Sequence, residues 1–375
     1  MALSETKRVA HAHSSSIHST AIESTESRFM VSAGDDFSIK LYDLNSFETT
    51  ATCTRKISPS ASSATPAHNR RISCVEWYPV DNGMFTTSSL DHTLKVWDSG
   101  SLAEACVFDL ESRVFCHRMS PTGAHALIAV ADESAYMRLC DLRTGSFAQS
   151  LLAHHSGSMA VAWSPAQSFA LVSGGNDGVL SLWDIRRADS HLYSFGCPDN
   201  ANDCSPHTNE GPVVAHKGSV SSVLFAGDGS RVASIDSSGS LHVWDIECPQ
   251  APMASCQLSV AKGCNALAGP TQMALSSATG GRPNYEVLFC PGSGRSIAAV
   301  DMAAGQQIAS LESHFAPTLC AAWRPSHLEL YSSGMDGEIH IWCPPAAEEL
   351  SEQQRRARED TWSDSGEENN SIVDT

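Results

Sequence analysis

Residues 173–184 read SGGNDGVLSLWD, and this stretch decides the fold of the whole chain. Two short apolar runs flank the pair Asp177-Gly178, in which glycine permits the positive φ that a tight turn needs. The second run ends on Trp183-Asp184. The stretch therefore predicts two strands joined by a short turn.

The same ending recurs along the chain at Tyr42-Asp43, Trp97-Asp98 and Trp244-Asp245, and more weakly at Cys140-Asp141, Val300-Asp301 and Trp342-Cys343. In four units an Asp precedes the aromatic residue by six positions, a Ser or Thr precedes that Asp by four, and a His precedes it by 22 or 23. These residues are His13, Ser32 and Asp36; His68, Thr87, Asp91 and Trp97; His154, Ser173, Asp177 and Trp183; and His314, Ser332, Asp336 and Trp342. A fifth unit keeps His216, Ser234 and Trp244 but has Ser238 at the Asp position.

A buried hydrogen-bond network explains this spacing, because each side chain satisfies another's polar group. The pattern is that of WD40 repeats, and it resembles a β-propeller with one four-stranded blade per unit. We therefore expect an all-β, seven-bladed propeller over residues 1–343. The expected blades are residues 11–44, 68–99, 110–142, 154–187, 216–247, 257–302 and 314–343. Because Pro344 and Pro345 follow Trp342, the last blade is expected to take its outer strand from residues 5–11.

Composition excludes several classes of function. The formal charge of −18 is unsuited to phosphate contacts, so we expect no direct binding to nucleic acid. The 13 cysteines form no CxxC pair, which argues against a disulfide framework and a zinc ribbon. No GxSxG, HExxH, P-loop or GxGxxG motif is present, and we expect no enzyme, cofactor or metal. The most apolar short run, residues 126–131, is too short to cross a membrane.

Three polar segments lie outside the repeats: residues 58–67, 188–212 and 344–375. The second contains His191, Cys197, Cys204 and His207, whose spacing matches no zinc pattern and favours a mobile loop over a metal site. The third carries nine acidic residues and three arginines, and we expect a disordered acidic tail. Its Ser363 and Ser365 are candidate phosphorylation sites.

Two consecutive repeats carry Asp-x-Arg after their third strand, namely Asp141-Leu142-Arg143 and Asp184-Ile185-Arg186. In a propeller these turns open on the bottom face, so both arginines are expected there together. The arrangement resembles the WDxR box of receptors that dock on the DNA damage-binding adaptor of cullin-4 ubiquitin ligases. Arg suits such an interface because its planar fork bonds two acceptors at once. The alternative is an Arg that pairs locally with the preceding Asp.

Longer stretches extend the resemblance to the Cockayne syndrome group A (CSA) family over residues 7–375. They are VEWYP at 75–79, TLKVWD at 93–98, MSP at 119–121, WDIRRA at 183–188 and EDTWSDSGEE at 359–368. The resemblance implies a nuclear, non-catalytic substrate receptor of a cullin-4 RING ubiquitin ligase. It implies action in transcription-coupled nucleotide excision repair at stalled RNA polymerase II, with a Cockayne syndrome group B-like translocase as partner. Its adaptor-binding positions here are Trp183, Asp184, Arg186, Asp141 and Arg143.

Family members carry a helical segment before the first blade that inserts into the adaptor, and none is recognisable here. Either the sequence is incomplete at this end, or docking depends on the bottom face alone. A ligase receptor is expected to leave Arg186 exposed and unpaired. The alternative function is a general WD40 interaction scaffold with no ligase role.

Overall fold

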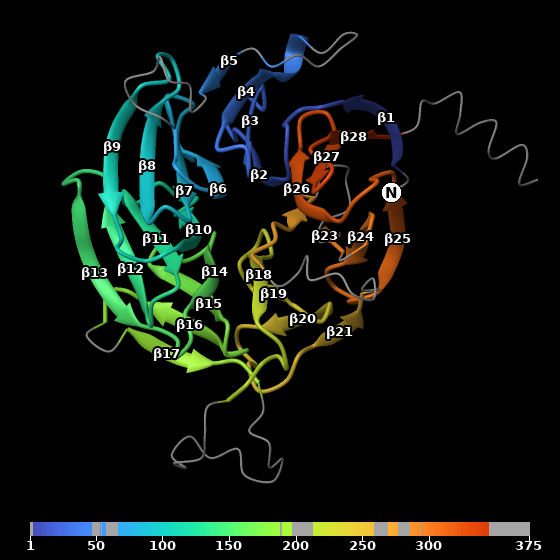
Figure 1. The fold of residues 1–375 in the computed structure, drawn as a ribbon. Helices are drawn as coiled ribbons and strands as arrows, with labels where there is room; N and C mark the ends of the chain where they lie inside the picture. Colours follow the sequence, from blue (N-terminus) through green and yellow to red (C-terminus); the bar gives the residue numbers. More distant parts are fainter. Residues whose placement is uncertain are drawn as a thin grey trace, which may run out of the picture.

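The computed structural model describes residues 3–46, 53, 55–57, 67–187, 190–196, 213–258, 269–276, 286–292 and 294–344. Seven antiparallel sheets of four strands each form a closed ring in this part of the chain (Figure 1). The predicted all-β, seven-bladed fold is confirmed. Among the described residues, no helix has the length and apolar content that a membrane crossing requires.

Each sheet is one blade, and its strands run from the central axis outward. Blades one to three contain β2 (Ile17–Ile22), β3 (Phe29–Gly34), β4 (Ile39–Asp43) and β5 (Arg55–Ile57); β6 (Ile72–Trp77), β7 (Met84–Ser89), β8 (Thr93–Asp98) and β9 (Glu104–Asp109); and β10 (Val114–Met119), β11 (Leu127–Asp132), β12 (Tyr136–Asp141) and β13 (Ser146–Leu152). A short 3₁₀ helix, η1 (Leu44–Ser46), follows β4.

The remaining blades follow the same order. Blades four to six contain β14 (Ser158–Trp163), β15 (Ala170–Gly175), β16 (Leu180–Asp184) and β17 (His191–Ser194); β18 (Val220–Phe225), β19 (Arg231–Asp236), β20 (Ser240–Asp245) and β21 (Ala254–Gln257); and β22 (Ala274–Leu275), β23 (Val287–Pro291), β24 (Ser296–Asp301) and β25 (Gln307–Glu312). Blade seven contains β26 (Thr318–Arg324), β27 (Glu329–Gly334), β28 (Ile339–Cys343) and β1 (Ser4–Val9).

The ring closes through β1, which pairs antiparallel with β28 and lies beside it in Figure 1. Strands from both ends of the propeller thus share one sheet, and β28 has no open edge. Arg324 adds a second tie across this junction. Its buried guanidinium donates to the Ser27 carbonyl at 2.7 Å and to Asn45 Oδ1 at 2.8 Å, both in blade one, and to Glu329 Oε2 at 3.0 Å within blade seven.

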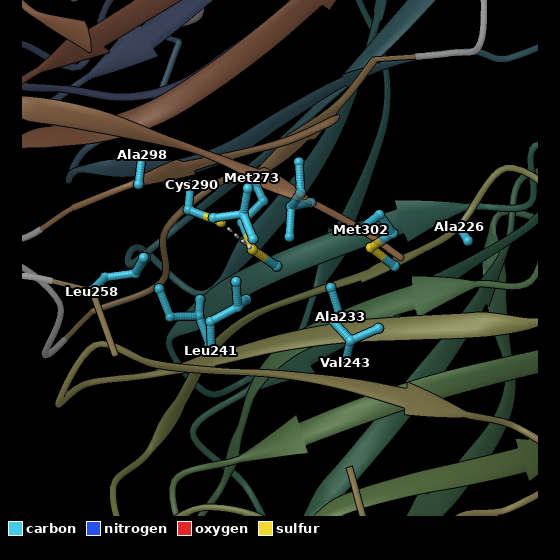
Figure 2. Close-up of a cluster of buried hydrophobic side chains, with 12 residues drawn as sticks. Ala226, Ala233, Leu241, Val243, Leu258, Met273, Cys290, Ala298 and Met302 are labelled. Carbon is cyan, nitrogen blue, oxygen red and sulfur yellow. Dashed lines mark hydrogen bonds between the residues drawn. The ribbon is translucent and has the colours of Figure 1, made fainter. Parts of the chain in front are cut away.

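The apolar core is divided into wedges between neighbouring sheets, because each sheet buries both faces against its neighbours. The wedge between blades five and six shows this arrangement (Figure 2). Met273, Cys290 and Met302 from blade six meet Leu241 and Val243 from blade five. Alternation of large and small side chains lets the two faces pack without a gap.

The innermost strands line a central channel, and the residues just before β22 of blade six contact the inner strands of blades one and seven there. Gln272, just before β22, accepts a hydrogen bond from Ser19 Oγ at 2.7 Å and donates to the Thr20 carbonyl at 2.8 Å. Cavities of about 460 Å³ and 320 Å³ are lined by Gly269-Pro270 and by Gln272-Met273 respectively. This segment therefore divides the channel.

The two faces of the ring carry different connections. We call bottom face the side with the turns between the first and second and between the third and fourth strands of each blade. The top face carries the turns between second and third strands and the connections from blade to blade.

Candidate functional site

Four blades contain the buried network that the repeats predict. His68 is typical: its Nδ1 lies 2.9 Å from Asp91 Oδ2 and its Nε2 lies 2.8 Å from Thr87 Oγ1. Thr87 Oγ1 also accepts the Trp97 indole N–H at 2.8 Å. The same pairs join His13, Asp36 and Ser32; His154, Asp177, Ser173 and Trp183; and His314, Asp336, Ser332 and Trp342. A set repeated so regularly holds the top-face connections to the blades.

The Asp side chains of this network are strongly stabilised as anions. Burial alone would raise the pKa of Asp91, but hydrogen bonds from His68, Thr93 and the Asn69 N–H outweigh it. The pKa of Asp91 is therefore held well below its usual range. Sequence spacing did not reveal the Thr93 contribution, which sits two residues after the Asp.

Blade five keeps the network with a different carboxylate. The sequence predicted that Ser238 stands where the Asp is lost, but Asp236 takes the role from two residues earlier. Its Oδ2 lies 3.6 Å from His216 Nδ1, while Ser238 donates its hydroxyl to Asp236 Oδ1 at 2.7 Å. His216 Nε2 bonds Ser234 Oγ at 2.7 Å, and Ser234 accepts the Trp244 indole N–H. Asp and Ser have exchanged positions, a signal that the sequence does contain.

Blades three and six replace the network. In blade three Asp132 and Ser134 show the same exchange, with the Ser134 N–H donating to Asp132 Oδ1 at 2.8 Å, and Arg138 Nε lies 3.8 Å from Asp132 Oδ2. In blade six Cys290 occupies the Ser/Thr position and its Sγ lies 3.7 Å from the Met273 sulfur, the dashed contact in Figure 2. That blade is therefore joined by apolar contacts where others use a polar chain.

One group among the described residues has the composition of a metal site: His314, Asp336 and His340. The His314–Asp336 bond at 2.7 Å is the same bond that blades one, two and four make without a second histidine. The group is therefore accounted for by the blade network. Of the second candidate cluster, His191 lies in β17, whereas Cys197, Cys204 and His207 lie outside the described residues. Ser363, Ser365 and most of the acidic tail lie outside them too.

The two Asp-x-Arg turns have matching backbone geometry on the bottom face. The Arg143 N–H donates to Asp141 Oδ1 at 2.9 Å, and the Arg186 N–H donates to Asp184 Oδ1 at 3.1 Å. The intervening Leu142 and Ile185 N–H groups bond the carbonyls of Ala126 and Phe169 at the base of the neighbouring strand. The two turns therefore begin alike, but they close differently: the Gly145 N–H bonds the Asp141 carbonyl, whereas the Arg187 N–H bonds the Asp184 carbonyl.

Their arginine side chains differ. The expectation that Arg186 is exposed and unpaired is half wrong: its side chain is 62% exposed, but its Nε and Nη2 bond both oxygens of Asp184 at 3.0 and 2.8 Å. The reason is local, since the turn folds the guanidinium back over the carboxylate and onto the Phe169 ring, 5.1 Å from its centroid. Hydrogen bonds from Arg186 hold the pKa of Asp184 below its usual range. Within the described residues, the exposed Arg143 side chain has no such partner.

A contact that sequence reasoning missed links these turns. His125, just before β11 of blade three, bonds the Ser168 carbonyl of blade four at 2.7 Å, and its ring packs against Phe169 and Trp163. Phe169 in turn supports Arg186. These contacts join the bottom faces of blades three and four into one continuous surface. The spacing of the repeats does not predict them.

Trp183, which the resemblance places in the adaptor-binding set, is 4% exposed and donates its indole N–H to Ser173 Oγ at 2.8 Å. It therefore supports the turn from inside the blade and does not reach a partner. Asp141 and Asp184 are half-buried and serve mainly to shape the turns.

Comparison with known proteins agrees with this architecture. The WD domain, G-beta repeat model matches residues 4–43, 60–98 and 305–343, and the nucleolar protein 10-like N-terminal domain model matches residues 114–265. The chain is 24% identical to WD repeat-containing protein ATCSA-1 of Arabidopsis thaliana over 96% of this chain and 93% of that protein.

Two other relatives match about half of the chain. Radiation-sensitive protein 28 of Saccharomyces cerevisiae is 26% identical over 50% of this chain and 40% of its own length. The ribosome biogenesis protein WDR12 homolog of Drosophila mojavensis is 30% identical over 50% of this chain and 45% of its own. With the matched repeats and the seven blades together, the chain is a WD40-repeat protein that folds as a seven-bladed β-propeller.

Proposed function

We propose that this propeller is the substrate-recognition subunit of a cullin-4 RING ubiquitin ligase and acts in the nucleus in transcription-coupled nucleotide excision repair. The observation that carries the proposal is the pair of equivalent Asp-x-Arg turns on adjoining blades, joined through His125 and Phe169. The end-to-end similarity to ATCSA-1 supports it. The partners are the DNA damage-binding adaptor, stalled RNA polymerase II and a Cockayne syndrome group B-like translocase.

In this role the chain performs no chemistry. It holds a target protein close to the ubiquitin-transferring subunits, and the gain in rate comes from effective concentration. The bonds between Arg186 and Asp184 fix the guanidinium before binding, so little side-chain freedom is lost on docking. The remaining N–H groups of that guanidinium and the whole Arg143 fork are available to acceptors on the adaptor.

A second candidate is a role in ribosome biogenesis, which the WDR12 homologues and the nucleolar protein 10-like match favour. Cells that lack the protein distinguish the two. Repair function predicts failure to resume RNA synthesis after ultraviolet damage with normal ribosomal RNA processing. Defective ribosomal RNA processing without that failure would overturn the repair proposal and support the second candidate.

Biochemical reconstitution tests the ligase role directly. The full chain is mixed with the adaptor, cullin-4 and the RING subunit and analysed by size-exclusion chromatography. We expect one co-eluting complex, with Arg143→Ala displacing the chain from it. Arg28→Ala is a matched control, because Arg28 also bonds its blade's Asp43 through two N–H groups and lies over Phe29. Failure of the wild-type chain to co-elute contradicts the proposal.

A further inference from the structure

Among the described strands, the outer strand of every blade has one edge without a paired neighbour, and one of these seven outer strands is unlike the rest. Proteins protect such edges from other chains with short strands or charges. β5, β17 and β21 have three or four residues, while β1, β9 and β25 carry charged side chains. β13 has seven residues, SFAQSLL, and no charge. Its edge is therefore the one open to pairing with an extended partner.

An exposed apolar stripe runs beside this edge. Tyr136 pairs with Leu152 and Cys140 pairs with Phe147, and residues 136 and 140 point to the same face of β12. Tyr136, Phe147 and Leu152 therefore share one face and are 49%, 44% and 64% exposed. Arg138 lies between residues 136 and 140 on this face, and its guanidinium sits 5.6 Å from the centroid of the Phe147 ring. The exposed apolar surface therefore consists of the paired Tyr136 and Leu152 at one end and Phe147 at the other.

This stripe looks toward blade two. Cys140 on the same face packs among the blade-two side chains Leu94 and Phe108, and the Phe108 and Phe147 ring centroids are 6.2 Å apart. Phe108 lies on the outer strand β9, so blade two covers the Phe147 end of the face, whereas Tyr136 and Leu152 at the other end stay exposed. The result is a wedge with an apolar wall and a backbone edge, which suits a strand that pairs with β13 and inserts alternate side chains.

Charge indicates the chemistry of the occupant. Arg143 lies in the turn that leads into β13, and within the described residues its exposed guanidinium has no partner. An antiparallel strand on β13 would end beside it, where a carboxylate is favoured. A second copy fits poorly, because the formal charge of −18 opposes self-association and antiparallel β13 strands would bring Arg143 to the uncharged far end of the other strand.

We propose that the β13 edge and the stripe of Tyr136, Phe147 and Leu152 bind an extended segment of a partner protein that is apolar at alternate positions and acidic at its C-terminal end. This surface lies on the rim and meets the bottom face at Arg143, which the adaptor-docking role also uses.

Fluorescence anisotropy with synthetic peptides tests the proposal on the full chain. One probe alternates valine and threonine and ends in two aspartates, and the other ends in two lysines. We expect saturable binding of the aspartate probe, about tenfold tighter than the lysine probe. Leu152→Glu should weaken it about tenfold, and Ile308→Glu, at a 42% exposed position on β25, should not. Hydrogen exchange of the β13 amides should slow on binding.

Three results would overturn the proposal. They are no saturable binding to the wild type, equal binding to Leu152→Glu and wild type, and protection of another outer strand in place of β13. Sedimentation gives a further check: a wild-type dimer abolished by Leu152→Glu would assign the edge to a second copy. Equal Tm values for Leu152→Glu and Ile308→Glu would show that a change in peptide binding or in dimerisation comes from the altered surface and not from unfolding.

Discussion

Each buried His–Asp pair is a polar contact that stabilises the fold because all its partners are present. The Asp236 carboxylate accepts from Ser238 and from the Ser240 N–H while facing His216. Burial acts to raise the pKa of Asp236, yet these donors hold it well below its usual range. Removing the carboxylate, or the histidine that faces it, leaves buried polar groups without a partner, so these two substitutions are costly.

Truncation of a network tryptophan tests this at one residue. Trp183→Ala removes a side chain that is 4% exposed, together with the indole N–H that Ser173 Oγ accepts, so we expect the free energy of unfolding to fall by about 3–5 kcal/mol. Trp183→Phe keeps much of the apolar contact and should cost less. Urea unfolding of the three proteins measures both effects, and an unchanged midpoint for the alanine variant contradicts the network account.

Acidification should destabilise the protein below pH 7. Burial lowers the pKa of His13 and His68, and lowers that of His242 to about 4. The folded state keeps these rings neutral while the unfolded chain binds protons below a pKa of about 6.5, so the free energy of unfolding falls as pH falls. The network Asp residues, with depressed pKa values, add a further loss only below about pH 4.

The pH effect is measured as Tm between pH 7.5 and 5. His242→Gln removes one side chain whose pKa is lowered by folding. The free energy of unfolding that is lost between pH 7.5 and pH 5 should therefore be smaller in this variant by about 1 kcal/mol, after allowance for solvent screening. A Tm that rises between pH 7.5 and pH 5, in the wild type or in His242→Gln, would contradict the prediction that acid destabilises the protein.

At the scale of the blade, the fifth unit shows that the network can be kept while its Asp and Ser exchange places. Asp236 occupies a position where the regular blades have a small residue. Ser238 occupies the position of their network Asp. The role of Asp236 could have been predicted from the sequence by allowing a shift of two positions. The contact of the Cys290 thiol with the Met273 sulfur could not, because it depends on a residue that directly precedes the short strand β22 of blade six.

Paired substitutions in blade five separate the two residues. Asp236→Ala should cost about 2–3 kcal/mol, since it removes the acceptor that faces His216 and that binds the Ser240 and Gly218 N–H groups. Ser238→Ala should cost under about 1 kcal/mol. Thermal unfolding of both variants decides the assignment. If Ser238→Ala lowered the free energy of unfolding as much as Asp236→Ala or more, Ser238, at the position that the repeat spacing predicted, would be the network residue, and the assignment to Asp236 would be wrong.

At the scale of the molecule, stability depends on closing the ring. β1 pairs with β28, Arg324 ties blade seven to blade one, and Gln272 ties blade six to blade one through the channel. The all-β propeller with seven blades was predictable, because the repeats are regular. The channel-crossing segment and the His125–Phe169 link were not, since both join residues whose proximity exists only after closure.

Loss of the Arg324 tie should weaken closure. Arg324→Leu leaves the Ser27 carbonyl and Asn45 Oδ1 without this donor and removes the ion pair of Glu329, and we expect a loss of about 2–4 kcal/mol in the free energy of unfolding. Arg8→Ala, at an exposed ion pair with Glu338, should change it by less than about 1 kcal/mol. Denaturant melts compare the two, and equal effects would show that the junction contributes little.

The central claim is that the bottom face of blades three and four docks the propeller on the DNA damage-binding adaptor. The most direct measurement is the dissociation constant of the purified adaptor for the wild type, for the double variant Arg143→Ala/Arg186→Ala, and for Arg28→Ala. The account predicts that the double variant binds at least about tenfold more weakly at unchanged Tm, while Arg28→Ala binds as the wild type does. Wild-type affinity in the double variant, or no binding by the wild type, would contradict it.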